Sequence, residues 1–280
     1  MPDGFLPPGF VALDLAAALG LPLFDPDSKS APVAPGTHPK FSNGLIGSDP
    51  SKPEVVVAAN GGSDLVYLPN GDKKLAAQVV TALLAQDYVS GLFVDDSLGQ
   101  FPGTLPLSAI NLKGSAVTPM PAIAVNFRTE TSDCAEKVTC EIEVADTGLQ
   151  QGQGMHGSFD RGDTMNFMAA IGPDFKTGFT DLAPASNADI GKTLAQILRL
   201  KIPAKGKLVG RVLDEAMPGG QTPRYVAKVM QSAPAPGGLI TVLDYQLVGD
   251  TSYFDAAGFP GRSFGLSEPK RQAAGTNQPN

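Results

Sequence analysis

Short, uninterrupted apolar runs along the chain predict the strands of a buried sheet. The clearest run is Val55 to Ala59, which is rich in β-branched residues. A turn-forming Asn60-Gly61-Gly62 separates it from Asp64 to Leu68, so the two runs are expected to form a hairpin closed by a tight turn. Further strands are predicted at 91–95, at 122–127 and at 138–144, where apolar and polar residues alternate as in an edge hairpin with one solvated face.

Other segments repeat apolar residues every three or four positions, which is typical of amphipathic helices. Residues 10–19 predict a short strand that runs into a helix ending at Gly20. Residues 72–86 predict a helix whose apolar face consists of Leu75, Val79, Val80, Leu83 and Leu84. A helix between strands favours an α/β fold, a layered sheet with helices on its faces. Two strands at 225–230 and 239–248, joined by a Pro/Gly-rich segment, predict a C-terminal β-hairpin.

A further helix is predicted from Ser186 to about Leu200. Ser186 is a favourable N-cap residue, and Asp189 three positions later approximates a capping box. The periodicity indicates that this helix turns one apolar face toward a core. That face consists of Ile190, Leu194, Ile197 and Leu198.

One stretch, residues 152–163, places four glycines around His156, one of the two histidines in the chain. The apolar run 167–171 follows, and it predicts a strand buried on both faces and stopped by Gly172-Pro173. A histidine on a glycine-rich loop beside a rigid strand is a candidate metal ligand, because imidazole binds divalent ions well. The competing interpretation is a loop histidine hydrogen-bonded to backbone, since a lone histidine has no ligand spacing.

A family resemblance is carried by three segments: His156 to Asp160, Met168 to Lys176 with its Gly-Pro-Asp-Phe-Lys ending, and Ser186 to Asp189. Together they resemble the C-terminal signature of the alkaline phosphatase superfamily, in its type I phosphodiesterase/nucleotide pyrophosphatase branch. The similarity covers about residues 1–215. It implies a phosphoric ester hydrolase with a two-metal mechanism, in which a Thr or Ser oxygen attacks phosphorus. It also implies that His156 is a ligand of one of two divalent ions, which in this family are usually zinc.

The resemblance extends only to the C-terminal half of such an enzyme. The sequence contains no Asp-x-x-x-His and no Asp-His-Gly segment, which supply other metal ligands in the family, and no strand that ends in the nucleophile. We therefore expect the nucleophile, most metal ligands and any export signal to lie in a missing N-terminal half. His156 is then the single ligand in this sequence, which has no catalytic residue of its own and an incomplete sheet that exposes an apolar face. The alternative is a non-catalytic remnant that binds a ligand or partner.

Composition and charge narrow the possible partners. A net charge of −7 disfavours a nucleic-acid backbone but allows a phosphoester substrate, because bound metal ions would supply positive charge. No apolar run approaches the ~20 residues of a membrane span, so no membrane span is expected. Residues 1–4 do not begin a signal peptide.

The two cysteines, Cys134 and Cys140, flank a short charged segment, and the sequence leaves open whether they form a local disulfide or remain thiols. A disulfide would fit the periplasmic or secreted location expected of the full-length enzyme. His38 and the pair Asp95-Asp96 are interpreted as solvated residues of loops or strand ends. The expected organisation is an alkaline-phosphatase-like portion at 1–215, a β-hairpin extension at 216–266 and a disordered tail at 267–280.

Overall fold

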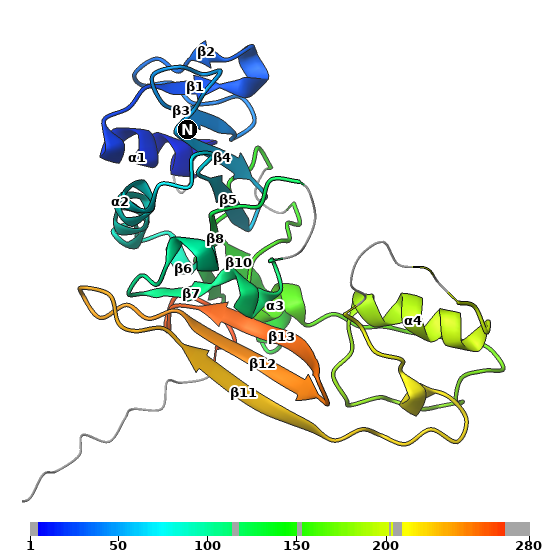
Figure 1. Ribbon diagram of the computed structural model, residues 1–280. Helices are drawn as coiled ribbons and strands as arrows, with labels where there is room; N and C mark the ends of the chain where they lie inside the picture. The colour runs from blue at the N-terminus through cyan, green and yellow to red at the C-terminus, as the bar shows by residue number, and fades with distance from the viewer. Residues whose placement is uncertain (1–4, 114–117, 150–152, 202, 204–208, 267–280) are drawn as a thin grey trace, which may run out of the picture.

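The computed structural model describes residues 5–113, 118–149, 153–201, 203 and 209–266, so the predicted tail lies outside the described residues. Within that part of the chain the fold is mixed α/β (Figure 1). A large sheet with two helices beside it forms the body, and a smaller antiparallel sheet packs next to it. A lobe around helix α4 (Asn187–Ile197) lies beyond the end of the smaller sheet. The predicted combination of a sheet, helices and C-terminal strands is thus confirmed.

The large sheet has eight strands: β1 (Leu23–Asp25), β2 (Ala31–Pro32), β3 (Gly44–Ile46), β4 (Val55–Ala59), β5 (Ser63–Tyr67), β6 (Val89–Val94), β7 (Thr104–Pro106) and β8 (Ile123–Phe127). Their order is β2-β1-β3-β4-β5-β8-β6-β7, and β6 and β7 form its parallel pair. The predicted hairpin is confirmed as β4 and β5, with Val57 opposite Val66.

Strand β8 lies between β5 and β6, the two strands on either side of the predicted helix at 72–86. Because β5 and β6 are both antiparallel to β8, they run parallel to each other on either side of it. Helix α2 (Lys73–Leu84) connects them, and helix α1 (Phe10–Leu19) packs beside α2. Both helices lie on the same side of the sheet in Figure 1. Between helices and sheet, the rings of Phe10, Tyr88 and Phe127 pack with centroids 4.6 to 6.2 Å apart.

The two helices of the body begin in different ways. Asp72 caps α2 by accepting hydrogen bonds from two first-turn N–H groups. Helix α1 begins directly after Gly9, which is left-handed (φ 75°), so the strand predicted ahead of this helix is wrong. Gly9 has no side chain to act as a cap, and Oδ1 of Asp146 accepts its N–H at 2.7 Å instead. Gly20 ends α1 with φ 67°, as predicted.

The C-terminal strands form three antiparallel neighbours: β11 (Tyr225–Gln231), β12 (Val242–Val248) and β13 (Thr251–Gly258). The predicted hairpin is confirmed as β11 and β12. The sequence did not predict β13, whose polar and small residues lack a regular alternation. This sheet packs on the body through Phe93, Ala124 and Leu243. A Cβ at Gly91 would lie 2.9 Å from Cα of Gly258, so the close approach of the two sheets requires glycine.

The apolar run 167–171 does not form the buried strand that its composition predicts. It is irregular rather than a strand, and Phe167 and Ile171 are 91% and 99% exposed. No described strand pairs with it, and an apolar run is buried only where neighbouring elements cover it.

Helix α4 has the predicted capping box of Ser186 and Asp189, but its orientation differs from the prediction. Asp189 and Thr193 are buried, whereas Ile190, Leu194 and Leu198 are exposed. The expected apolar face therefore exists, and within the described residues it covers no core.

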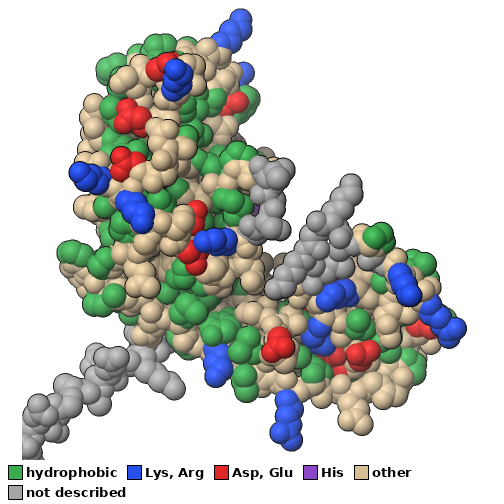
Figure 2. All heavy atoms as spheres, viewed as in Figure 1, with side chains coloured by type: hydrophobic (Ala, Val, Ile, Leu, Met, Phe, Trp, Pro, Cys, Tyr) green, Lys and Arg blue, Asp and Glu red, His purple; other side chains and the backbone are tan. Residues whose placement is uncertain are grey.

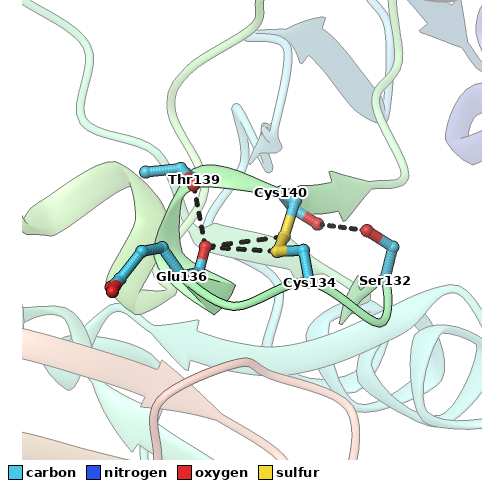
Figure 3. Close-up of a disulfide and its surroundings, with 5 residues drawn as sticks. All are labelled: Ser132, Cys134, Glu136, Thr139 and Cys140. Carbon is cyan, nitrogen blue, oxygen red and sulfur yellow. Dashed lines mark hydrogen bonds between the residues drawn. A yellow bond between two sulfur atoms is a disulfide. The ribbon is translucent and has the colours of Figure 1, made fainter.

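A two-stranded ribbon, β9 (Thr129–Thr131) with β10 (Glu141–Glu143), replaces the longer hairpin predicted at 138–144. A disulfide joins Cys134 to Cys140 in the connection between these strands (Figure 3). In that connection, Oγ1 of Thr139 donates to the carbonyl oxygen of Glu136 at 2.8 Å. The short helix α3 (Arg161–Thr164) follows the His156 loop. None of the helices in the described ranges is long and apolar enough to cross a membrane.

Candidate functional site

His156 is exposed, and it lies on an irregular segment whose backbone is fixed at several points. Its carbonyl oxygen accepts the N–H of Gly62 at 3.3 Å. Two residues later, the N–H of Ser158 donates to Oδ2 of Asp163 at 2.7 Å. Phe159 N–H donates to the side chain of the buried Asn126 on β8 at 2.8 Å. The histidine is therefore accessible on a well-anchored loop, although the strand predicted beside it is not formed.

The turn at residues 60–63 supports the His156 loop. It is the tight turn that the sequence predicts between β4 and β5. Gly157 adopts φ 106°, and a Cβ there would lie 2.9 Å from the carbonyl oxygen of Asn60. A Cβ at Gly62 would lie 2.6 Å from the nitrogen of Ser158. The glycines therefore let the loop and the turn pack backbone against backbone.

A group of carboxyl side chains lies beneath this loop. Burial and the neighbouring Asp160 raise the pKa of Glu141 to about 8. Burial, together with Asp163 and Asp160, raises the pKa of Glu143 to about 7. Ser158 donates its hydroxyl to the buried Asp160, which also caps α3. The alternation of Glu141 and Glu143 along β10 predicts a solvated face, whereas in the structure both side chains are partly buried.

A further acidic pair, Asp64 and Asp146, contacts the same turn, and its members are 0% and 2% exposed. Burial first, and then the charge of Asp146, raise the pKa of Asp64 well above its usual range. Burial also raises the pKa of Asp146, against the opposing effect of backbone N–H groups. Asp146 N–H donates to the carbonyl oxygen of Gly61 at 2.9 Å, so this pair also contacts the turn. No local sequence pattern indicates this pair, because its members are 82 positions apart (146 − 64).

The remaining sequence candidates lie elsewhere. His38 is an exposed loop residue, as predicted, and its Nδ1 lies 2.9 Å from the carbonyl oxygen of Pro39. Asp95 and Asp96 directly follow β6, which confirms their assignment to a strand end. Their carboxylates lie 3.5 and 3.7 Å from the ammonium of Lys113. Across the described ranges, no three His, Cys, Asp or Glu side chains are arranged to hold a metal ion.

A buried polar network joins the α4 lobe to the C-terminal sheet. Asp189 accepts hydrogen bonds from the N–H of Arg211 at 2.7 Å, from the N–H of Ser186 at 2.8 Å and from the hydroxyl of Tyr253 at 3.0 Å. The guanidinium of Arg211 forms a bidentate pair with the buried Glu215. This network fixes one side of α4 and leaves its apolar side outward.

Comparison with protein-family models, with curated proteins and with solved structures found no match for this chain.

Proposed function

We propose that this chain contributes one metal ligand, His156, to a metal-dependent phosphoester hydrolase of the phosphodiesterase/nucleotide pyrophosphatase type. The proposal includes an alkaline-phosphatase-like fold that is completed by polypeptide outside this sequence. The observation that carries it is an exposed histidine on a loop whose backbone is fixed at residues 156, 158 and 159. A ligand of a composite site must be accessible to the other donors, and its backbone must be held in place.

His156 fits as one donor of such a site. Zinc binds imidazole nitrogen, and a zinc site uses three or four protein ligands, so this histidine requires further donors from outside the sequence. Two bound divalent ions would polarise the phosphoryl group and activate the attacking oxygen. The role of this chain is then to hold the backbone that carries one imidazole, through the hydrogen bond that Gly62 N–H donates to the carbonyl oxygen of His156.

The exposed apolar side chains support a composite protein. Figure 2 shows apolar side chains exposed on the α4 lobe, among Lys and Arg side chains. Burial of a large apolar side chain stabilises a protein by about 1.5–3 kcal/mol, so these residues favour association with a covering polypeptide. The most exposed of them are Phe167, Ile171, Leu182 and Leu198. The Cys134–Cys140 disulfide supports the further proposal that the enzyme functions in the periplasm or outside the cell.

The test is a comparison of two histidine variants in the completed enzyme, assayed on an aryl phosphodiester with and without added zinc. His156→Ala should lower kcat/KM by at least about 100-fold, because even groups that only support metal ligands contribute about 10- to 100-fold. His38→Ala is the matched control, since His38 is also an exposed loop histidine, and it should have the wild-type rate. Unchanged turnover in His156→Ala would exclude this histidine as a ligand.

A non-catalytic protein that binds a partner through α4 is the second candidate. The exposed side chains of Ile190, Leu194 and Leu198 favour it, because they form one face of a capped helix. The two candidates differ in their dependence on His156. A partner-binding protein would lose its partner when α4 is changed and would be indifferent to His156→Ala.

A further inference from the structure

In the buried acidic pair Asp64 and Asp146, one carboxyl oxygen on each side chain has no hydrogen-bond donor among the described residues. Oδ2 of Asp64 and Oδ2 of Asp146 are both inaccessible to solvent, and apart from the facing carboxyl group neither accepts a hydrogen bond from a described residue. The two carboxyl groups are in contact, and no ion pair within the described residues reaches either of them. Two buried carboxylates in contact repel each other strongly, whereas one proton between them satisfies both oxygens.

The surroundings indicate which carboxyl group holds that proton. Asp146 accepts the N–H of Gly9 at 2.7 Å and also faces the N–H of Val11 and the hydroxyl of Ser42. These donors at the start of α1 favour a negative charge on Asp146, since a helix N-terminus has a partial positive charge. From the residues that the structure describes, the Asp64 side chain accepts one longer bond, from Asn60 N–H at 3.3 Å. Asp64 is therefore the better site for the proton.

The pair connects three segments that are distant in the sequence. Asp146 binds the start of α1 through Gly9 and binds the β4–β5 turn through Gly61. Asp64 is the second residue of β5 and bonds back to Asn60 at the start of the same turn. Gly62, which follows Gly61 in this turn, donates its N–H to the carbonyl oxygen of His156. A change in the protonation of the pair is thus transmitted to the His156 loop through two backbone hydrogen bonds, from Asp146 N–H to Gly61 and from Gly62 N–H to His156.

We propose that Asp64 is a positioning residue, which carries a proton donated to Asp146 and so holds the turn that supports His156. The effect of Asp64 on the turn is independent of the proposed function, and only the role of His156 as a metal ligand rests on it. The proton transfer is simple: deprotonation of Asp64 releases the proton to water and leaves two adjacent carboxylates. The turn and the start of α1 would then separate.

Other titratable groups near the pair must be distinguished from it. Tyr88 faces both carboxyls, and its hydroxyl donates to Asp14 at 2.9 Å. Burial and the charge of Asp14 raise the pKa of Tyr88. Glu143 is also close to the turn, because a Cβ at Gly62 would lie 2.8 Å from its Oε2. Because burial raises the pKa of Glu143 to about 7, an alkaline change at Gly62 has two possible sources.

The experiment follows the backbone amides of Gly9, Gly61, Gly62 and Gly157 by NMR, in the full chain without metal or substrate. The pH is varied from about 5 to about 10 in the wild type, in Asp64→Asn and in Glu143→Gln. Asn keeps an N–H donor for Asp146 and cannot ionise. The wild type and Glu143→Gln should show an alkaline transition at Gly9 and Gly61, and Asp64→Asn should lose it.

The proposal is overturned if the transition persists in Asp64→Asn, if it disappears in Glu143→Gln, or if the wild type has none. If Asp64→Asn does not fold, the wild type and Glu143→Gln still decide the result, because both must show the transition at Gly9. A separate phosphodiester assay tests the proposed function, so an inactive or metal-free protein does not affect this outcome.

Discussion

The hydroxyl of Tyr253 on β13 donates a hydrogen bond to Oδ2 of Asp189, 3.0 Å away, at the first turn of α4. Tyr253 and Asp189 are both buried, and the ring of Tyr253 also lies 5.8 Å from the guanidinium of Arg211. This contact joins the lobe that carries the outward apolar face to the sheet packed on the body. The orientation of that lobe therefore depends on a polar contact as well as on apolar packing.

Tyr253→Phe should destabilise the protein by about 1–2 kcal/mol, because a buried acceptor on Asp189 loses a donor. Urea unfolding monitored by circular dichroism would measure the loss. Tyr225→Phe, at a 42% exposed position on β11, is the matched control and should be close to neutral. Equal stabilities of the two variants would show that the Tyr253 bond contributes nothing.

The glutamates beneath the His156 loop predict that stability falls as the pH rises. Burial and Asp160 raise the pKa of Glu141 from 4.5 to about 8, so the folded state binds this proton more tightly than the unfolded state. The contribution is fully present below the unfolded pKa of about 4.5 and is lost as the pH rises through about 8. Glu141→Gln should reduce the fall in unfolding free energy between about pH 5 and pH 9. An unchanged slope would contradict the prediction, and Glu130→Gln, on the exposed part of β9, is the control.

The disulfide predicts a redox dependence of stability. The bond between Cys134 and Cys140 closes a short loop. A disulfide across a loop of this size stabilises the folded protein by about 2 kcal/mol, because it lowers the entropy of the unfolded chain. Cys134→Ser with Cys140→Ser should lower the unfolding free energy by that amount. A reducing agent should have the same effect on the wild type and none on the double variant. A melting temperature insensitive to reduction in the wild type would show that the bond contributes no stability.

The apolar face of α4 predicts concentration-dependent self-association of the isolated chain, because large exposed apolar surfaces favour contact with other molecules. Leu198→Glu should reduce this association at little cost in stability, since Leu198 is 62% exposed. Gln196→Glu adds the same charge at another exposed position of α4 and is the control. Sedimentation velocity at several concentrations would compare the three proteins. A monodisperse wild type at all concentrations would contradict the prediction.

The sequence predicted the elements that local patterns define. Val55 to Ala59, the amphipathic α2 and the capping box of α4 all follow from the residues within each element. Their hydrogen bonds and caps are local, so neighbouring positions are sufficient to specify them. The exposure of His38 follows in the same way from its Pro/Gly-rich loop.

Where the predictions were wrong, the missing information was which element lies next to which. The run 167–171 has the composition of a buried strand, but no described strand pairs with it. Asp189 is buried and Leu194 is exposed, the reverse of the usual pattern, because Tyr253 and Arg211 bind the polar side of α4. The acidic pair Asp64 and Asp146 depends on contact between segments 82 positions apart (146 − 64).

The sequence by itself determined the β4–β5 hairpin with its turn at residues 60–63, helix α2, the end of α1 at Gly20, the capping box of α4 and the candidate histidine. Only the tertiary structure decided that β8 enters between β5 and β6, that Asp146 binds the N–H of Gly9 just before α1, and that the His156 loop rests on the β4–β5 turn. The physical reason is that burial and long-range hydrogen bonds depend on packing between distant segments. The periodicity of one segment does not specify which other segment will cover it.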